Sequence, residues 1–383
     1  MEIDLDNAAT TPIEPEVRSA MLPYLEQHFG NPSSRHPPGL LAAKALEQAR
    51  ATIARALGAG PEDVVFTSGG TEANNLAVLG LARARKRHGR HVLVGPTEHP
   101  SVREAAAALE NEGFEVETLP LDATGGLDVE RSAAALRPDT VLLALMLVNN
   151  EFGTVYPVAR VARLARANAP SAWIHVDAIQ ALGKVPVSLA ELGVSSLSLT
   201  AHKVHGPKGS GALVLAEGVR PLPLLLGGGQ ERGLRSGTEN VAGIVGLARA
   251  VALAVQSQRE AARSMHRLRS LLCEELSRWR GARVLDPGGK DAVSPAIAAV
   301  QLPGPPAEVW MHHLERRGIY TSAGSACHAK KRSVSSALLV LGLDAQEALH
   351  VLRFSFSRHT REEELRRALE VLKEVESELS ARR

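Results

Sequence analysis

The strongest constraint on the fold is a regular alternation of strand-like and helix-like segments between about residues 58 and 215. Short apolar runs predict strands at residues 64–66, 91–94, 141–147, 173–176, 196–199 and 212–215. Helical patterns lie between most of them, at residues 71–86, 101–112 and 158–168. Such alternation is typical of an α/β chain with a mainly parallel sheet covered by helices on both faces. The run at 141–147 is continuously apolar, as expected for a strand buried on both sides.

The flanking segments predict a second, smaller unit. Helices are expected before the alternating region at 14–27 and 40–57, the latter ending at Gly58 as a glycine C-cap. After a loop rich in proline and glycine at 221–236, the pattern predicts a long helix at about 240–279, a strand near 296–302, and helices near 307–317 and 360–380. We therefore expect three parts: an N-terminal segment (1–15) that joins the small domain, a large domain (16–255) and a small C-terminal domain (256–383).

Composition limits the function classes. The 383 residues include 44 basic and 42 acidic side chains, and this near balance gives no reason to expect a nucleic-acid or membrane partner. Two cysteines, Cys273 and Cys327, argue against a disulfide framework and fit a reducing compartment. The first residues lack the pattern of a secretory signal, and no apolar run is expected to reach the ~20 residues that span a bilayer. The sequence thus predicts a cytoplasmic protein, and its cysteines and histidines predict no metal site.

The run at residues 196–211 brings a lysine, Lys203, to the end of an apolar strand and into a loop rich in glycine and hydroxyl groups. A lysine at the end of a buried strand is costly unless it is paired or made covalent, because burial disfavours its charge. One chemistry that uses such a lysine is a Schiff base with a carbonyl cofactor. The alternative is a surface loop with two solvated lysines, and this run by itself favours the alternative.

Residues 68–72, Ser-Gly-Gly-Thr-Glu, follow one strand and open a helix. Glycine at Gly70 lets backbone N–H groups approach an anion, the helix N-terminus is positive, and Thr71 adds a hydroxyl. This is a candidate phosphate cradle. A structural turn with an N-cap explains the same residues equally simply.

Three further strands end in polar residues. Asp177 ends the strand at 173–176, where ligands bind in open α/β sheets, and its carboxylate could hold a pyridinium N–H while Gln180 reaches the ring's phenolic oxygen. His99 follows another strand and could stack on the ring and move protons. Asn150 follows the third and could contact ring or substrate. Helix capping accounts for each motif alone, but together they are what a pyridoxal-phosphate site requires.

Two residues of the C-terminal part could act on a substrate. Cys327 lies in a small, polar, glycine-bearing segment followed by basic residues, and nearby positive charge favours the reactive thiolate. Cys273 lies in an apolar helical pattern and is interpreted as a core residue. Arg353 lies in a strand-like run, where its planar fork suits a substrate α-carboxylate. An intramolecular salt bridge is the alternative for Arg353.

Together these motifs resemble the cysteine desulfurases, pyridoxal-phosphate enzymes of aminotransferase fold type I. The resemblance runs from residues 5–11, Leu-Asp-Asn-Ala-Ala-Thr-Thr, to residues 353–355, Arg-Phe-Ser. It implies a large domain with a mainly parallel seven-stranded sheet between helices, a smaller C-terminal α/β domain and pyridoxal 5′-phosphate as cofactor. It also implies that the cysteine lies on a mobile loop at about 321–335, as in the housekeeping and nitrogen-fixation type.

The resemblance implies a role for each motif residue. Lys203 would bind the cofactor covalently and abstract the substrate's Cα proton, while His99 stacks on the ring and assists proton transfer. Cys327 would attack the substrate sulfur, become a persulfide and release alanine. The implied cofactor contacts are Gly70, Thr71, His99, Asn150, Asp177 at the pyridine nitrogen, Gln180 at O3′, Thr200, His202, Lys203, and Thr238 from the other subunit of a homodimer with shared active sites. The implied binders of the substrate carboxylate are Asn31 and Arg353.

Two departures from the family pattern and several alternatives stay open. Thr200 stands where a serine is usual, and residues 328–332 are more basic than the common form of this loop. The sulfur acceptor implied by the family is an iron–sulfur scaffold, a tRNA-thiolation protein or another carrier. The competing functions are a selenocysteine lyase, an aminotransferase or β-lyase of the same fold, and a scaffold protein without catalysis.

Overall fold

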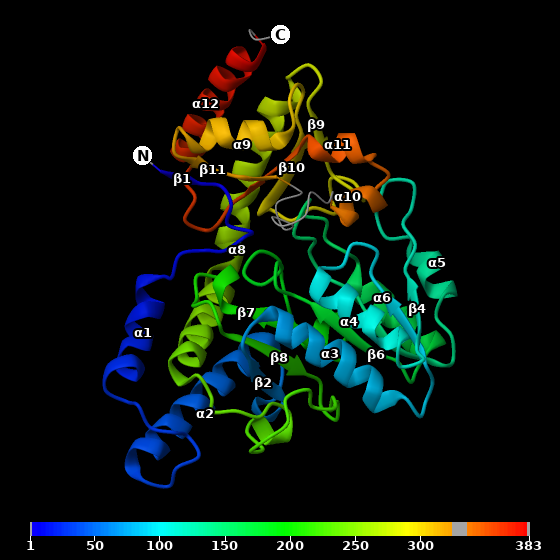
Figure 1. Cartoon of the computed structure of the whole chain (residues 1–383), viewed down its shortest axis with the longest axis vertical. Helices are drawn as coiled ribbons and strands as arrows, with labels where there is room; N and C mark the ends of the chain where they lie inside the picture. The colour runs from blue at the N-terminus through cyan, green and yellow to red at the C-terminus, as the bar shows by residue number, and fades with distance from the viewer. Residues whose placement is uncertain (1, 324–334, 381–383) are drawn as a thin grey trace.

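The computed structural model describes residues 2–323 and 335–380. The chain forms a large part around a seven-stranded sheet and a smaller part above it, and the long helix α8 (Val241–Ser277) runs from one into the other (Figure 1). The first strand, β1 (Ile3–Asp4), lies with the smaller part, so the N-terminal segment crosses from there to the large part.

The large sheet has the strand order β2-β8-β7-β6-β5-β3-β4. The five strands from β7 to β4 are parallel, and β8 runs antiparallel to both of its neighbours. The predicted strands are confirmed as β2 (Val64–Thr67), β3 (His91–Val94), β5 (Thr140–Ala144), β6 (Trp173–Asp177), β7 (Ser196–Thr200) and β8 (Gly211–Leu215). The seventh, β4 (Glu115–Thr118), was not predicted because this edge strand carries two glutamates and is largely exposed.

Helices cover both faces of this sheet. One face packs against α3 (Gly70–Arg85) and α4 (Pro100–Glu110), through residues such as Leu76, Leu81 and Val102. The other packs against α2 (Pro37–Leu57), α6 (Val158–Asn168) and the first half of α8. Helix α2 ends at Gly58, which has a left-handed φ of 71° and confirms the expected C-cap. The remaining helices of this part are α1 (Pro15–Glu26), α5 (Val129–Ala134) and α7 (Leu189–Leu192).

The smaller part is built on an antiparallel sheet with the order β12-β13-β10-β9. Its strands are β12 (Ser322–Ala323), β13 (Val351–Ser355), β10 (Ile297–Gln301) and β9 (Arg283–Leu285), and β11 (Ile319–Tyr320) pairs with β1. Helices α9 (Ala307–Glu315) and α12 (Glu362–Ser380) pack on it, with the short α10 (Ser336–Val340) and α11 (Ala345–Leu349) alongside (Figure 1). Ile3 and Leu5 lie in its core beside Trp310 and Phe354.

Helix α8 is more apolar than the sequence analysis expected. Within the described part of the chain, it is the one helix that is long and apolar enough to cross a membrane by length and composition. Half of its most apolar stretch is buried inside the protein, where Leu247 and Val251 belong to the large core. Further along, Met265, Leu268 and Leu272 belong to the small core. The apolar character of α8 is therefore used to hold the two parts together.

Candidate active site

The carboxyl ends of the central parallel strands open into a cavity of about 460 Å³. Strand β13 and the N-terminal segment close its other side. The cavity brings together most of the residues singled out in the sequence: Gly70, Thr71, His99, Asn150, Asp177, Gln180, Thr200, His202, Lys203 and Arg353. These residues come from segments up to about 280 residues apart in the chain. The large sheet brings most of them together because the carboxyl ends of its parallel strands share one edge, and Arg353 comes from β13 of the smaller part.

Lys203 lies directly after β7, on a short 3-10 turn (Ala201–Lys203). Its Nζ donates hydrogen bonds to the carbonyl oxygens of Ala8 and Ala9, both at 2.6 Å. The N-terminal segment therefore binds the ammonium group of Lys203 at the wall of the cavity. These carbonyl oxygens orient the Lys203 side chain at the cavity.

Asp177 is the last residue of β6 and is buried. Its Oδ1 accepts the backbone N–H of Ile179 at 2.9 Å, and its Oδ2 accepts the Asn74 side-chain amide at 2.8 Å. Burial raises the pKa of this carboxyl above its usual value, and the nearby His99 and Lys203 oppose the rise only in part. A buried carboxylate that lines a cavity is stabilised by a ligand that brings a protonated nitrogen, as a pyridinium does.

His99 precedes α4 and accepts the backbone N–H of Ser101 at its Nδ1, at 3.1 Å. The Ser101 hydroxyl lies 2.8 Å from the same nitrogen. Burial lowers the pKa of His99, Lys203 lowers it further, and Asp177 offsets part of the change. The imidazole is therefore held neutral beside Asp177 and Lys203.

The opposite end of the cavity suits an anion. Helix α3 starts at Gly70, and no side chain of the described residues caps its N-terminus. A Cβ at Gly70 would lie 2.2 Å from Ile179 Cδ1, so a larger residue here would require the Ile179 side chain to move. The hydroxyl groups of Thr71 and Thr200 line the same end. His202 also lines the cavity, and burial together with Lys203 lowers its pKa to about 4, which leaves a neutral imidazole able to donate one hydrogen bond.

Arg353 reaches the cavity from β13 and forms the salt bridge that the sequence left open as an alternative. Its Nη2 lies 2.7 Å from Asp6 Oδ1, and its Nη1 donates to the carbonyl oxygen of Asn150 at 2.8 Å. Asp6 also lines the cavity. The guanidinium is thus oriented by the N-terminal segment and faces the space beside Lys203, and the geometry is compatible with both interpretations of Arg353.

Two predicted residues do not line this cavity, and a third lies outside the described residues. Asn31 is exposed, and its Oδ1 accepts the backbone N–H of Ser33. Thr238 lines a separate cavity of about 130 Å³ with Ser68 and Arg235. Cys327, together with most of the loop expected at about 321–335, lies outside the described residues. Within the described residues, no group of three or more His, Cys, Asp or Glu side chains could hold a metal ion.

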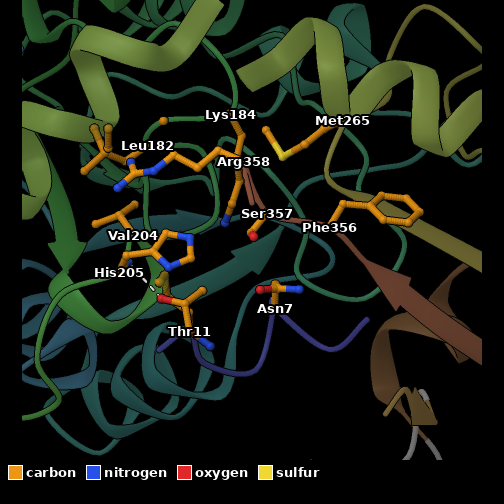
Figure 2. Close-up of a pocket in the computed structure, with 13 residues that line it drawn as sticks. Asn7, Thr11, Leu182, Lys184, Val204, His205, Met265, Phe356, Ser357 and Arg358 are labelled. Atoms are coloured by element: carbon orange, nitrogen blue, oxygen red, sulfur yellow. Dashed lines mark hydrogen bonds between the residues drawn. The ribbon is translucent and has the colours of Figure 1, made fainter. Parts of the chain in front are cut away.

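The structure also shows a charged group that the sequence analysis missed. Lys184 is buried, and its Nζ donates to Gln180 Oε1 at 3.0 Å. Figure 2 shows it beside Arg358 and Met265 around a second, smaller cavity that Lys203 also lines. Burial, together with the charge of Lys203, lowers the pKa of Lys184 to about 7. Nothing in the sequence distinguishes Lys184 from a solvated lysine, because its burial depends on packing against α8 and residues 356–358.

The residues present fit pyridoxal 5′-phosphate. An anion-binding helix start, a buried carboxylate and a lysine amine line one cavity, matching the phosphate, the pyridine nitrogen and the aldehyde of this cofactor. Gln180 donates its Nε2 to the Ala8 carbonyl oxygen at 2.9 Å, so the amide edge that faces the cavity is a donor. The fold and the site together define a pyridoxal-phosphate enzyme.

Comparison with known proteins gives the family. The model of the family "Aminotransferase class-V" matches residues 3–368. A "Cysteine desulfurase IscS" of Dictyoglomus turgidum is 38% identical over 374 residues, which cover 98% of this chain and 94% of that protein. "Cysteine desulfurase IscS 1" of Archaeoglobus fulgidus is 39% identical over 367 residues, or 96% of this chain and 95% of that one. The chain therefore belongs to the class-V aminotransferase family, whose members use pyridoxal phosphate.

Solved structures agree with this assignment. A "NIFS-LIKE PROTEIN" matches with a TM-score of 0.92 and 36% identity, covering 99% of this chain and 100% of that one. The structure titled "SspA in complex with cysteine" matches with a TM-score of 0.78 and 33% identity, covering 94% of this chain and 100% of that one. The fold expected from the sequence, type I with a mainly parallel seven-stranded sheet, is thereby confirmed.

Proposed function

We propose that this protein is a cysteine desulfurase, which removes sulfur from L-cysteine to give L-alanine and a persulfide on Cys327. The observation that carries the proposal is that Lys203, Asp177 and Arg353 line one cavity. The chain is also similar, over nearly its whole length, to relatives named cysteine desulfurase. A related protein, SspA, has been solved with cysteine bound, which supports cysteine as the substrate.

Different residues of the cavity bind the substrate, transfer the proton and hold the cofactor. Arg353 binds the α-carboxylate of the substrate, in competition with its ion pair to Asp6. The amine of Lys203, released from the carbonyls of Ala8 and Ala9, takes the Cα proton. Asp177 keeps a pyridine nitrogen protonated by holding its N–H with a buried carboxylate. Bound pyridoxal phosphate supplies an electron sink that makes the loss of the Cα proton possible.

Cys327 completes the reaction from the segment outside the described residues. Its thiolate attacks the sulfur of the substrate, so that an S–S bond forms as the substrate's Cβ–S bond breaks. The Cβ receives a proton, Lys203 returns a proton to the Cα, alanine leaves, and Cys327 retains the sulfur as a persulfide. An aminotransferase or β-lyase needs no such thiol, so Cys327 separates these alternatives from the proposal. A selenocysteine lyase would use the same residues and stays the second candidate.

We further propose a homodimer with shared active sites. Large apolar side chains are exposed on two segments of the large part: Leu22, Leu25, Phe29, Leu40 and Leu41 on α1, α2 and the loop between them, and Leu222, Leu225 and Leu226 on the loop at 221–236. The connection between α1 and α2 and the loop at 221–236 both lie at the end of the large part farthest from the smaller one (Figure 1). A second copy of the chain would cover them. Thr238, at the end of the same loop, would then contribute to the partner's phosphate site, and Asn31 lies between the two helices.

The cellular role follows from the proposed product. A protein-bound persulfide needs a protein acceptor, and we propose an iron–sulfur scaffold or a tRNA-thiolation protein in the cytoplasm. The name IscS, shared by several relatives, supports the iron–sulfur assignment. The direct test is a mixture of loaded enzyme, L-cysteine and a candidate scaffold, followed by mass spectrometry of sulfur added to scaffold cysteines. Absence of transfer to either class of acceptor would refute this assignment while leaving the desulfurase reaction intact.

The test of the reaction measures alanine and sulfide released from L-cysteine in the presence of reductant. The wild type should be yellow and active, Lys203→Ala inactive, and Cys327→Ser yellow but inactive. Full turnover by Cys327→Ser would overturn the proposal and favour the aminotransferase or β-lyase alternative. Turnover of L-selenocysteine by Cys327→Ser, with loss of L-cysteine turnover, would favour the selenocysteine lyase.

A further inference from the structure

A buried polar network connects the cofactor-facing groups, and its centre is Asn74 on α3. This side chain is fully buried and is not part of the cavity wall. Its Nδ2 donates to Ser101 Oγ and to Asp177 Oδ2, both at 2.8 Å. Its Oδ1 accepts the hydroxyl of Ser198 and faces His175 Nε2 at 3.1 Å. Both amide hydrogens and the amide oxygen are thereby used, so the orientation of Asn74 is determined on every side.

The charge of Asp177 sets the direction of these hydrogen bonds. An ionised carboxylate only accepts, so the NH2 group of Asn74 must face Asp177 and its oxygen must face His175. His175 then carries its proton on Nε2, and its Nδ1 accepts from the Ser196 hydroxyl at 2.9 Å. Burial lowers the pKa of His175 to about 3, so this imidazole stays neutral. The network therefore has one consistent proton arrangement.

The same network reaches His99 through Ser101. The Ser101 hydroxyl accepts from Asn74, which leaves its own proton free to be donated to His99 Nδ1 at 2.8 Å. The backbone N–H of Ser101 points to that nitrogen as well. Because both groups donate to Nδ1, the neutral imidazole of His99 must carry its proton on Nε2.

We propose that Asn74 is a positioning residue that couples the two groups on either side of the cofactor: it holds the carboxylate of Asp177 and, through Ser101, fixes the Nε2–H tautomer of His99. The proposal rests on the proposed function only in assigning Asp177 and His99 to the cofactor. It adds that the uncharged amide of Asn74 orients both the Asp177 carboxylate and the neutral imidazole of His99.

The neighbouring charges show why an amide is suited to this place. The ionisable groups that face Asp177 are His99, Lys203 and Glu98. Glu98 is buried, its Oε1 accepts the backbone N–H of Met146 at 2.6 Å, and burial raises its pKa well above the usual value. A second carboxylate at the position of Asn74 would face Asp177 directly, whereas a cation would compete with the cofactor's protonated nitrogen. An amide donates without adding charge.

The first test compares Asn74→Asp with its matched control Asn75→Asp. Asn75 is the next residue of α3, and its Nδ2 donates to the Ser101 carbonyl oxygen at 2.8 Å. Both variants replace an amide that binds Ser101 with a carboxylate, but only Asn74→Asp sets that carboxylate against Asp177. In the loaded enzyme, the absorbance of the lysine–cofactor chromophore is titrated with pH. Asn74→Asp should add a second step or shift the apparent pKa by about one unit or more, as like charges in contact do. Asn75→Asp should titrate like the wild type.

A wild-type titration curve for Asn74→Asp, or the same shift in both variants, would overturn the proposal. The second test needs neither a variant at Asn74 nor catalysis. In wild-type apo-protein with 15N-labelled histidine, nitrogen shifts report which ring nitrogen of His99 carries the proton, with His99→Gln identifying the signals. The proposal requires Nε2–H, and a proton on Nδ1 would refute it. Alanine release is measured separately, so failure of the desulfurase reaction and failure of this inference are distinguishable.

Discussion

Glu231→Gln is expected to destabilise the protein far more than its position in a loop suggests. Glu231 begins the short 3-10 turn Glu231–Gly233 and is buried, with only 1% of its side chain exposed. Its two oxygens bind the Arg50 guanidinium in a bidentate pair, both at 2.9 Å, and one of them also accepts the backbone N–H of Phe66 at 2.8 Å. The Arg50 side chain is 5% exposed. Glutamine keeps the shape but cannot neutralise this buried cation.

The structure sets the magnitude. Removing one partner of a buried pair costs about 3–5 kcal/mol. The remaining carboxylate beside Arg50, that of Glu47 at 3.3 Å, is 67% exposed and offsets only a small part of this cost. The matched control is Glu112→Gln, which breaks the pair of Arg83 and Glu112 at 2.6 Å, where the side chains are 32% and 31% exposed. Partly exposed pairs of this kind contribute at most about 1 kcal/mol. The contrast between the two variants therefore tests burial and leaves the chemical substitution constant.

The assay is urea unfolding of the cofactor-loaded protein at one pH and one protein concentration, with the free energy of unfolding compared between variants. A loss of less than about 1 kcal/mol for Glu231→Gln, equal to that of Glu112→Gln, would refute the reasoning. Because Glu231 anchors the loop at 221–236 that leads to Thr238, the variant should also weaken the proposed dimer. Sedimentation over a dilution series measures that effect.

Two further predictions concern charges at the active site. The pKa of Lys184 is lowered from 10.5 to about 7, so between these values the unfolded chain binds the proton that the folded protein releases, and the free energy of unfolding rises with pH. Lys184→Met should flatten that rise in urea unfolding between pH 7 and 10, and an unchanged slope would contradict the assignment. Arg353→Lys keeps the charge but loses the planar guanidinium that can bind a carboxylate through two hydrogen bonds. The KM for L-cysteine should therefore increase roughly tenfold or more. Asp6→Asn removes the competing carboxylate and should lower KM, and a KM that rises in both variants would indicate that the ion pair is only structural.

The sequence predicted most of the sheet and the convergence of polar strand ends for one physical reason. In a parallel sheet the carboxyl ends of neighbouring strands share an edge, so Asp177 and Lys203 had to lie close together once their strands were recognised. The ion pair of Asp6 and Arg353 was not predictable in the same way, because the two residues are 347 positions apart and meet only through the packing of the N-terminal segment on β13. Sequence spacing carries no information on such a contact.

The buried network shows a second limit of sequence reasoning. Asn74 and Asn75 are neighbours of one type on one helix, and no pattern in the sequence separates them, yet one binds the Asp177 carboxylate and the other a backbone carbonyl. The four hydrogen bonds of Asn74 come from α4, β6 and β7, so its role exists only when these elements are in register. It follows that a change in how α3 packs on the sheet would alter the hydrogen bonds of Asp177 and His99 without replacing any residue that lines the cavity. The effect of substitutions where α3 packs on the sheet should therefore be measured first in the pH titration of the cofactor's absorbance and then in turnover.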